Sequence, residues 1–357
     1  MERFAFVIHP LSAKKDVARK YPFVKVLPES WVEWGMKHKS PMEVSHITGI
    51  RSKAGVEAEG WLVGCPLSPK LIMTMPVEKV YEKILGAIKI AEQLGAKIVG
   101  LGALTSVVGD AGVTIAERAN IAVTTGNSYT IATAVEGAIK GAELLGINPN
   151  EVRAAVVGAT GSIGKTCAQL LAGRCAEIIL IGRSDDRLQA VADELSIGGG
   201  SASVATDVAE GIRDADIVVT VSSAVDAIIE PSFIKPGAVV CDVARPRDVG
   251  ESVRRERDDV LIIDGGVIDV PGDVNFNFNF GFPPKTAYAC MSETMILALE
   301  GRYESYTLGR EVSVGQVTAI SDMADKHGFK MAGFRSFERA VTSEQIEQIR
   351  KNAAKAR

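Results

Sequence analysis

Residues 151–187 read EVRAAVVGATGSIGKTCAQLLAGRCAEIILIGRSDDR, and this stretch decides the expected fold. A short apolar run over residues 154–157 leads directly into the glycine pattern Gly158-x-x-Gly161-x-x-Gly164. A helical pattern follows, and a second apolar run covers residues 178–181. Strand, glycine turn, helix and strand in this order form the first unit of a dinucleotide-binding fold. The sequence therefore predicts an α/β protein with a Rossmann-type doubly wound parallel sheet.

The glycine turn is expected to bind a pyrophosphate. Glycines let the backbone turn tightly and approach the phosphates, and the helix that follows offers N–H groups and a partial positive charge. The alternative is a tight strand-to-helix turn that binds no ligand. The predicted contacts come from the turn and the start of the helix: Gly158, Thr160, Gly161, Ser162, Ile163 and Gly164.

The residues after the second apolar run indicate which dinucleotide binds. NAD sites usually carry an acidic residue there, which bonds the ribose hydroxyls. This chain has Arg183 and Ser184 instead. A guanidinium can bind a 2′-phosphate through two hydrogen bonds and a serine can add a donor, so the sequence predicts NADPH. Asp185 and Asp186 lie just beyond and could reach a ribose, which leaves NAD open.

The composition is that of an ordinary globular protein, with 46% apolar and 24% charged residues. The net charge of −4 lacks the basic excess of nucleic-acid binders, so no nucleic acid is expected as a partner. No apolar stretch is long enough to span a membrane, and the first residues carry no cleavable signal pattern. Five cysteines and four histidines without metal-like spacing predict reduced thiols, no metal site and a cytoplasmic location.

Three regions are expected along the chain. Residues 1–150 alternate strand and helix patterns and predict an N-terminal α/β substrate domain. Residues 151–283 are expected to form the NADPH-binding domain, and residues 284–357 a C-terminal helical segment. Within the middle region, the small side chains of Ser222 and Ser223 follow a buried strand, where a nicotinamide ribose could approach.

The segment PPKTAYACMSET, residues 283–294, contains the candidate nucleophile Cys290. Two prolines can precede or open a helix, which would place Cys290 in its first turn or two. A helix N-terminus and the nearby Lys285 would both favour a thiolate, which can attack a thioester. The alternative is a buried apolar cysteine on a helix face.

The other cysteines and nearby polar residues take lesser roles in this interpretation. Cys65 is the second candidate nucleophile, whereas Cys167 and Cys241 are expected in the core. Glu293 would raise the pKa of the Cys290 thiol and receives no catalytic role. The polar residues of two turns could hold an oxyanion or merely cap the helices after them; they are Thr105, Asn127 and Ser128.

Several stretches together resemble the long-chain acyl-[acyl-carrier-protein] reductases of cyanobacteria. They are LGALTSV (residues 101–107), TGNSYT (125–130), VVGATGSIG (156–164) and ACMSETM (289–295), and the match runs in order from Phe4 to Phe329. The resemblance implies that Cys290 takes an acyl group from a carrier-protein thioester and that NADPH reduces it to a fatty aldehyde. Tyr129, where the family tends to carry histidine, and residues 264–282 depart from the pattern, so coenzyme A stays open as the donor.

One loop offers a chemical parallel to another enzyme family, and two further functions remain open. The segment CDVARPRD, residues 241–248, is similar to a loop of glutamyl-tRNA reductases, which also reduce a cysteine-bound acyl group. A shikimate-type dehydrogenase would work without a covalent step, and it would need a Lys–Asp pair in the first domain, for which Lys97 and Asp110 are present. A non-catalytic NADPH-binding sensor is the third alternative.

Two surface features have competing interpretations. Residues 275–282, NFNFNFGF, would place all their phenylalanines on one side of a strand, as an aromatic wall or as a half-buried hairpin strand. Basic residues near the C-terminus could dock an acidic carrier protein or simply be solvated. They are Lys326, Lys330, Arg335, Arg339, Arg350, Lys351, Lys355 and Arg357.

Overall fold

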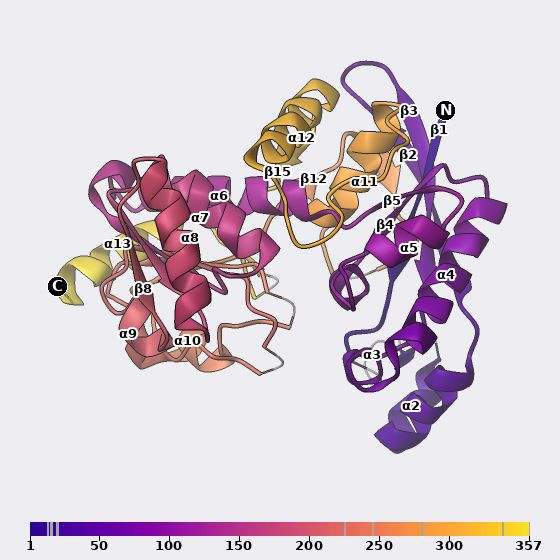
Figure 1. Cartoon of the computed structure of the whole chain (residues 1–357), viewed down its shortest axis with the longest axis horizontal. Helices are drawn as coiled ribbons and strands as arrows, with labels where there is room; N and C mark the ends of the chain where they lie inside the picture. The colour runs from indigo at the N-terminus through magenta and orange to yellow at the C-terminus, as the bar shows by residue number, and fades with distance from the viewer. Residues whose placement is uncertain are drawn as a thin grey trace. The chain divides into compact units, whose positions relative to one another are not determined.

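The computed structural model describes residues 1–12, 14, 17–18, 21–224, 226–244, 246–279, 281–337 and 339–356. The chain forms two compact units, each built from separate stretches of sequence (Figure 1). Unit 1 contains Met1–Asn127, Asp269–Glu311 and Ala319–Lys330. Unit 2 contains Ser128–Ile268, Val312–Thr318 and Met331–Arg357.

Unit 2 contains a six-stranded parallel sheet with the strand order β11-β10-β9-β6-β7-β8. This order is that of the dinucleotide-binding fold, with the switch point between β6 and β9. The predicted α/β class with a Rossmann-type sheet is therefore confirmed. The strands are β6 (Arg153–Val157), β7 (Glu177–Ile181), β8 (Ala202–Ala205), β9 (Ile217–Thr220), β10 (Val239–Asp242) and β11 (Leu261–Asp264).

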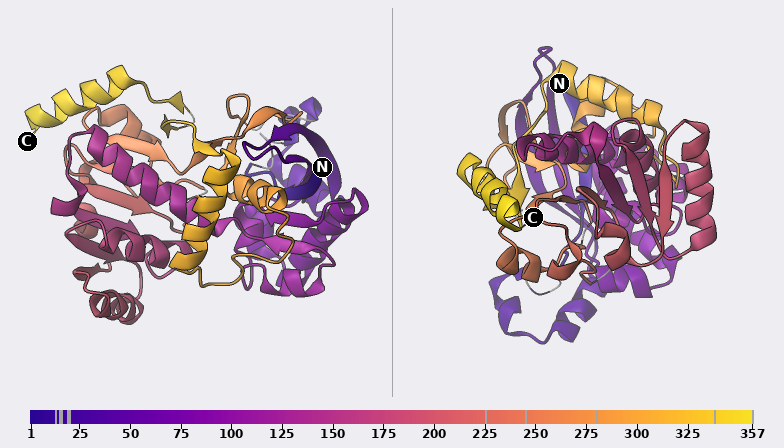
Figure 2. Two further views of the ribbon diagram at one scale, coloured as in Figure 1. Left: turned by 90° about the horizontal axis from the view of Figure 1, so that it is seen from above. Right: turned by 90° about the vertical axis from the view of Figure 1, so that its left-hand side faces the viewer.

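Helices cover both faces of this sheet, because its central strands are apolar on both sides (Figure 2). One face packs on α6 (Asn127–Leu144), α7 (Ser162–Ala172) and α8 (Asp185–Ile197). The other packs on α9 (Val208–Ile212) and α10 (Glu251–Glu256). Cys167 and Cys241 lie in the first of these two cores, as expected.

Unit 1 contains a six-stranded mixed sheet with the order β13-β2-β3-β1-β4-β5. The run from β3 to β5 is parallel, and β2 and β13 add antiparallel strands at one edge. The strands are β1 (Glu2–Ile8), β2 (Met42–Arg51), β3 (Glu57–Gly64), β4 (Ile98–Leu101), β5 (Ala122–Thr124) and β13 (Gly272–Asn275).

The alternation of side chains along β1 supplies both faces of this sheet. Ala5 and Val7 join the core beneath the amphipathic helix α4 (Val77–Gln93). Phe6 points to the opposite face, where Gly100 of β4 leaves room for its ring and for Thr294 of α11 (Ala289–Leu299). The sheet of unit 1 is therefore packed between α4 and α11.

Shorter elements complete the structure. They are η1 (Pro22–Val26), α2 (Glu29–His38), α3 (Pro69–Thr74), η2 (Ala103–Ser106), α5 (Val113–Arg118), η3 (Pro149–Glu151), η4 (Pro231–Phe233), β12 (Val267–Asp269), β14 (Thr286–Tyr288), α12 (Val314–His327), β15 (Lys330–Met331), β16 (Arg335–Ser336), β17 (Arg339–Ala340) and α13 (Ser343–Ala356). In the part of the chain that the structure describes, no helix is both long enough and apolar enough to cross a bilayer.

The compact units do not coincide with the predicted domain boundaries at either end of the middle region. The compact unit begins at Ser128 rather than at residue 151, because Ile131, Ala134 and Ala138 of α6 belong to its core. The segment with Cys290 is not a separate C-terminal part, because α11 packs on β1 and β4 of unit 1. A chain that crosses between units several times leaves no composition signal at the crossings.

The phenylalanine-rich run does not form the predicted strand. Strand β13 ends at Asn275, and Asn277 has a φ of +48°, which breaks the alternation of side chains. Phe276 is buried and the ring of Phe282 contacts Tyr288, with their centroids 4.4 Å apart. Phe280 lies outside the described residues.

Gly100→Ala should destabilise unit 1. A Cβ at this position would lie 2.1 Å from Thr294 Oγ1 and 2.4 Å from the Phe6 ring. We expect a loss of about 1–3 kcal/mol in the free energy of unfolding, measured in urea. Gly35→Ala on α2 is the matched control, because no atom lies within 4 Å of its added methyl group, and it should leave stability unchanged or slightly higher. Equal stability of Gly100→Ala and the wild type would contradict this packing.

Candidate functional site

Helix α11 exposes a single residue, the candidate nucleophile. Its sequence ACMSETMILAL is apolar or small almost all round, and every residue of the helix except Cys290 is buried. A helix that is apolar on all sides belongs in a core, so the partial exposure of its second residue stands out. The structure therefore places the Cys290 thiol at the N-terminal, accessible end of an otherwise buried helix.

Cys290 lies in the first turn of α11, as predicted, but the prolines only precede this helix. Pro283 and Pro284 do not open it, because the strand β14 intervenes and α11 begins only at Ala289. Lys285 has a φ of +64° and forms an ion pair with Asp273 at 2.8 Å. The electrostatic support proposed for a Cys290 thiolate therefore comes from the positive end of α11 itself, whose N-cap residue, Tyr288, makes no side-chain capping bond.

Gly126 packs directly against Cys290. A Cβ on Gly126 would lie 2.4 Å from both Cα and Cβ of Cys290, and the residue has a φ of +75°. Only glycine meets both conditions without strain. Gly126 also immediately precedes the first residue of α6, Asn127, which is buried. The predicted residue Asn127 therefore directly follows Gly126, the residue that contacts Cys290.

Below Cys290, a buried carboxylate joins α11 to the end of β5. Glu293 Oε1 accepts hydrogen bonds from Thr124 Oγ1 at 2.5 Å and Thr307 Oγ1 at 2.9 Å. Burial and, next, the charge of Glu293 raise the pKa of Tyr306. Glu293 positions the first turn of α11 and is buried, which agrees with giving it no part in the chemistry. Sequence reasoning missed this positioning role, since the two threonines are far away in the sequence.

The loop after β4 contains Thr105, and His9, which follows β1, bonds to the same loop. Thr105 was predicted as an oxyanion ligand, but its hydroxyl donates to the Gly102 carbonyl at 2.7 Å and is fully buried. His9, at the end of β1, accepts a hydrogen bond from the Leu104 N–H through Nε2 at 3.2 Å. Ser128 belongs to unit 2 and is also fully buried. Asn127 thus follows a residue that contacts Cys290, Thr105 is bonded to Gly102 and Ser128 is buried at the start of unit 2, while a role for any of them in holding an oxyanion stays a prediction.

The other cysteines are poor nucleophiles at neutral pH. Burial raises the pKa of Cys65 to about 12 and that of Cys167 to about 12. Burial also raises the pKa of Cys175 to about 11, and Cys241 is buried in a strand. Since the thiolate is the reactive form, Cys65 is no longer a competing candidate.

The glycine turn of unit 2 fits a dinucleotide pyrophosphate. Gly158 has a φ of +86°, and a Cβ on Gly164 would lie 2.2 Å from the Gly158 carbonyl oxygen. Helix α7 can approach β6 this closely only with glycine at both positions. Gly161 precedes α7, and no side chain in the described residues caps the helix, so its first turn is available to an anion. Thr160 lies in the glycine turn, and Ser162 and Ile163 begin α7.

The residues after β7 form the second part of the dinucleotide site. Arg183 is exposed, and Ser184 directly precedes α8. Arg187, which sequence reasoning did not single out, donates from Nη2 to the Thr160 carbonyl at 3.2 Å. The sequence did offer a signal for Arg187, because this residue lies one helical turn after Ser184. The Arg187 guanidinium therefore lies at the turn, whereas Arg183 is exposed, as are Asp185 and Asp186 in the first turn of α8.

Ser222, predicted to lie near a nicotinamide ribose, lies beside the glycine turn. A Cβ on Gly158 would lie 3.2 Å from Ser222 Cα. The Ser222 hydroxyl donates to Asp248 at 2.5 Å and its N–H donates to the same carboxylate at 2.9 Å. Asp248 therefore fixes the loop after β9, and Ser223 is the more exposed of the two serines.

The polar pair required by a shikimate-type dehydrogenase does not form. Lys97 pairs with Glu2 at 3.5 Å and lies over the Tyr303 ring. Asp110 accepts a hydrogen bond from the Thr114 N–H at 3.0 Å, and its pKa is lowered by such bonds from Thr114 and Tyr81 despite partial burial. Both residues are thus engaged in separate local interactions.

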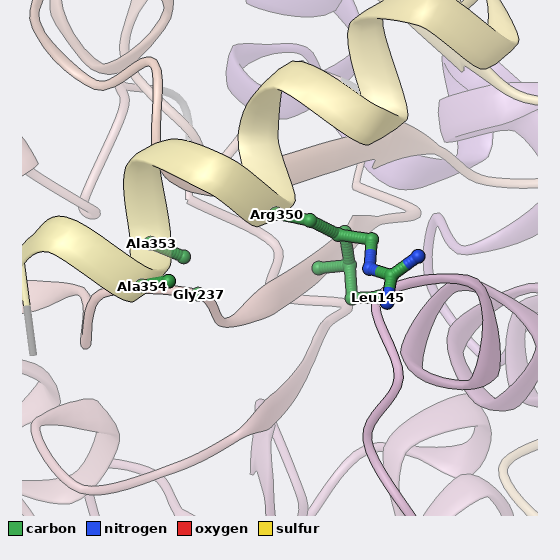
Figure 3. A pocket seen from close by; sticks show the side chains of 5 residues that line it. All are labelled: Leu145, Gly237, Arg350, Ala353 and Ala354. Atoms are coloured by element: carbon green, nitrogen blue, oxygen red, sulfur yellow. The ribbon is translucent and has the colours of Figure 1, made fainter.

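A cavity of about 220 Å³ in unit 2 is unrelated to either site (Figure 3). Leu145, Gly237 and Arg350 line it, together with two alanines of α13. Gly237 precedes β10 and Leu145 follows α6, so the cavity lies at the amino edge of the sheet. Ligands of such sheets bind at the opposite, carboxyl edge.

Comparison with known proteins agrees with this description. Residues 142–264 match the shikimate / quinate 5-dehydrogenase family model, which covers only the dinucleotide-binding part. The fold and the glycine turn therefore define the class: unit 2 is the NAD(P)-binding domain of an oxidoreductase.

Two curated proteins are similar to nearly the whole chain. The long-chain acyl-[acyl-carrier-protein] reductase of Synechococcus elongatus is 25% identical over 90% of this chain and 95% of its own length. The aminotransferase PigE of Serratia sp. is 27% identical over 98% of this chain, which spans only 42% of that protein. Among solved structures, glutamyl-tRNA reductase from Methanopyrus kandleri is 19% identical, with a TM-score of 0.32 over 78% of this chain and 56% of its own.

Cys290 should be the first cysteine to react with iodoacetamide. At about pH 8, Cys65, Cys167 and Cys175 remain thiols because their pKa values are raised to about 11–12. As the pH rises towards 11, the partly exposed Cys175 should become reactive. Peptide mass mapping over a time course at each pH measures both effects. Early label on Cys65 would contradict the assignment.

Gly126→Ala should displace Cys290 without unfolding the protein. The added methyl group meets the Cys290 backbone, and a displacement of about 1 Å can cost a reaction about 100-fold. The rate of Cys290 alkylation should therefore fall at least about tenfold. Gly55→Ala is the matched control, since Gly55 has a φ of +82° but no atom within 4 Å of an added Cβ. An equal effect of both variants would mean that backbone strain, and not the contact with Cys290, is responsible.

Proposed function

We propose that this protein reduces a long-chain acyl thioester to a fatty aldehyde through an acyl group bound to Cys290, with NADPH as the reductant. The observation that carries the proposal is the exposure of Cys290 alone on the buried helix α11. A purely structural cysteine in such a helix would be buried like its neighbours. The similarity to the Synechococcus reductase over nearly the full length of both chains adds support.

The first step is transfer of the acyl group to the protein. The Cys290 Sγ thiolate attacks the thioester carbonyl carbon, and the tetrahedral intermediate expels the donor thiolate, which takes up a proton from water. The oxyanion of the intermediate can be held by N–H groups of the first turn of α11, because these have no acceptor inside the helix. Asn127, next to Gly126, is the side chain that we expect to assist.

The second step releases the aldehyde and restores the thiolate. NADPH, when bound to unit 2, supplies the hydride that this reduction requires. Cys290 then leaves the former carbonyl carbon as a thiolate, which the N-terminus of α11 stabilises again. The contacts of Glu293 with Thr124 and Thr307 keep this helix end in place through both steps.

The preference for NADPH over NADH is assigned to Arg183, Ser184 and Arg187. The guanidinium groups would bind the 2′-phosphate, while the glycine turn binds the pyrophosphate. Ser222 and Ser223 are proposed to lie beside the nicotinamide ribose.

The proposed acyl donor is an acyl carrier protein, with coenzyme A as the alternative, and the proposed location is the cytoplasm. The predicted basic docking patch has no support as a single surface. Its residues divide between the two units, Lys326 pairs with Glu300 at 2.7 Å, and Arg350 pairs with Glu347 at 3.3 Å. Arg357 lies outside the described residues.

Cys290→Ser should retain NADPH binding and form no aldehyde. A serine hydroxyl without an activating base is too weak a nucleophile for the first step. The wild type, incubated with an acyl thioester but without NADPH, should gain the acyl mass on the peptide that contains Cys290. Added NADPH should discharge the label. Running carrier-protein and coenzyme A thioesters side by side identifies the donor.

Three results would reject this assignment: label on another cysteine, no label with aldehyde still formed, or near-wild-type turnover by Cys290→Ser. The second would favour reduction without a covalent step. NADPH binding with neither label nor aldehyde would favour the sensor.

Arg183→Ala should remove much of the preference for NADPH. Loss of a charged hydrogen bond to the 2′-phosphate should weaken NADPH binding by about 1.5–3 kcal/mol and leave NADH binding unchanged. Titration of both cofactors checks this, with Arg187→Ala tested in parallel. Equal affinities of the wild type for the two cofactors would disprove the assignment.

A further inference from the structure

A small lobe of unit 1, made of η1 and α2 (residues 21–39), exposes an unusual set of aromatic and aliphatic side chains. Trp31 and Trp34 on α2 are 67% and 69% exposed. Phe23 and Val26 on η1 are 65% and 84% exposed. Scattered single exposed apolar residues are normal, but four large ones within twelve residues need an explanation.

The inner face of the lobe accounts for its fold without these side chains. Val24 of η1 packs with Val32 and Met36 of α2 in a small core, which Leu71 of α3 also contacts. Glu33 pairs with Lys70 at 3.0 Å and holds the lobe to α3. Figure 1 shows α2 beside α3 at the end of unit 1. The exposed side chains are therefore not required to hold the lobe together.

Their spacing places them on outward faces. Trp31 and Trp34 are three residues apart on an α-helix and lie on one side of it. Phe23 and Val26 are three residues apart on a 3-10 helix, which has three residues per turn, so they also share a side. Since the inner faces of both elements meet in one core, both apolar pairs are turned away from that core.

The polar residues of the lobe favour an anionic surface. Lys25, Lys37 and Lys39 are exposed among the aromatic residues. Of the two carboxylates in the lobe, Glu33 is already matched by Lys70 from outside it. Tryptophan combined with lysine is the pattern of segments that lie in the interface of a bilayer, with rings at headgroup level and cations at anionic lipids.

We propose that the lobe of residues 21–39 is a peripheral docking surface for the headgroup region of an anionic lipid bilayer. Trp31, Trp34, Phe23 and Val26 enter the interface, while Lys25, Lys37 and Lys39 contact lipid phosphates. The inference rests on this surface alone and is independent of the proposed reduction. It is compatible with that reaction, because a long-chain aldehyde would partition into the same bilayer.

The positions of the three tryptophans make the proposal directly measurable. Trp61 is buried and stacked on His46, so its emission should not respond to lipid. Vesicles of phosphatidylcholine with phosphatidylglycerol should shift the fluorescence of the full chain to shorter wavelength. Brominated lipid should quench it, and the Trp61→Phe variant should show the same quenching. Phosphatidylcholine vesicles alone should bind at least about tenfold more weakly, and added salt should reduce binding to the anionic vesicles.

Trp31→Ser/Trp34→Ser should lower the fraction that sediments with anionic vesicles at least about tenfold, because each ring buries a large apolar area. Ile197→Ser is the matched control, since Ile197 is 89% exposed on unit 2 and should not matter. Thermal unfolding and NADPH binding should be unchanged in both variants.

Three outcomes would overturn the proposal. The wild type could fail to bind anionic vesicles, or the double variant could bind as well as the wild type. In the third, light scattering without lipid would show an oligomer of the wild type that the double variant loses. That result would assign the lobe to contact with a second copy of the chain, and retained NADPH binding would leave the proposed reduction untouched.

Discussion

The contact between Gly126 and Cys290 constrains much of unit 1. It joins the end of β5 to the start of α11, two elements distant in sequence, at a separation that excludes any Cβ on residue 126. This contact requires other interactions to keep the start of α11 in place. The buried Glu293 does this, because its carboxylate is satisfied by Thr124 and Thr307 and would be costly to bury without them.

The same constraint explains why the accessible end of α11 is suited to covalent chemistry. Close packing on β1 and β4 buries the helix, so its N-terminal N–H groups and partial positive charge are directed at one small region around Cys290. Burial has the opposite effect on Cys65 and Cys167, whose pKa values rise to about 12. In the proposed mechanism, environment rather than residue type separates Cys290 from the buried cysteines.

Unit 2 follows a more general design. Its parallel strand order and its glycine turn are those of dinucleotide-binding domains, and the family match over residues 142–264 ends where the general fold ends. The features that are particular to this chain lie outside this sheet and the glycines of its turn. Examples are the bond from Arg187 to the Thr160 carbonyl and the exposed aromatic lobe of unit 1, neither of which the general fold requires.

The sequence by itself determined the dinucleotide-binding unit, because β6, the glycine turn, α7 and β7 follow one another within thirty residues or so and obey local rules. It also placed Cys290 in the first turn of a helix, although Pro283 and Pro284 do not open that helix. Only the tertiary structure decided that α11 belongs to unit 1, that α6 belongs to unit 2, and that Glu293 is a positioning residue. Thr124 and Glu293 are 169 residues apart, and no local pattern encodes a contact of that range. The structure also decided that the Thr105 hydroxyl bonds to the Gly102 carbonyl, three residues earlier, and that β13 ends at Asn275 within the phenylalanine-rich run.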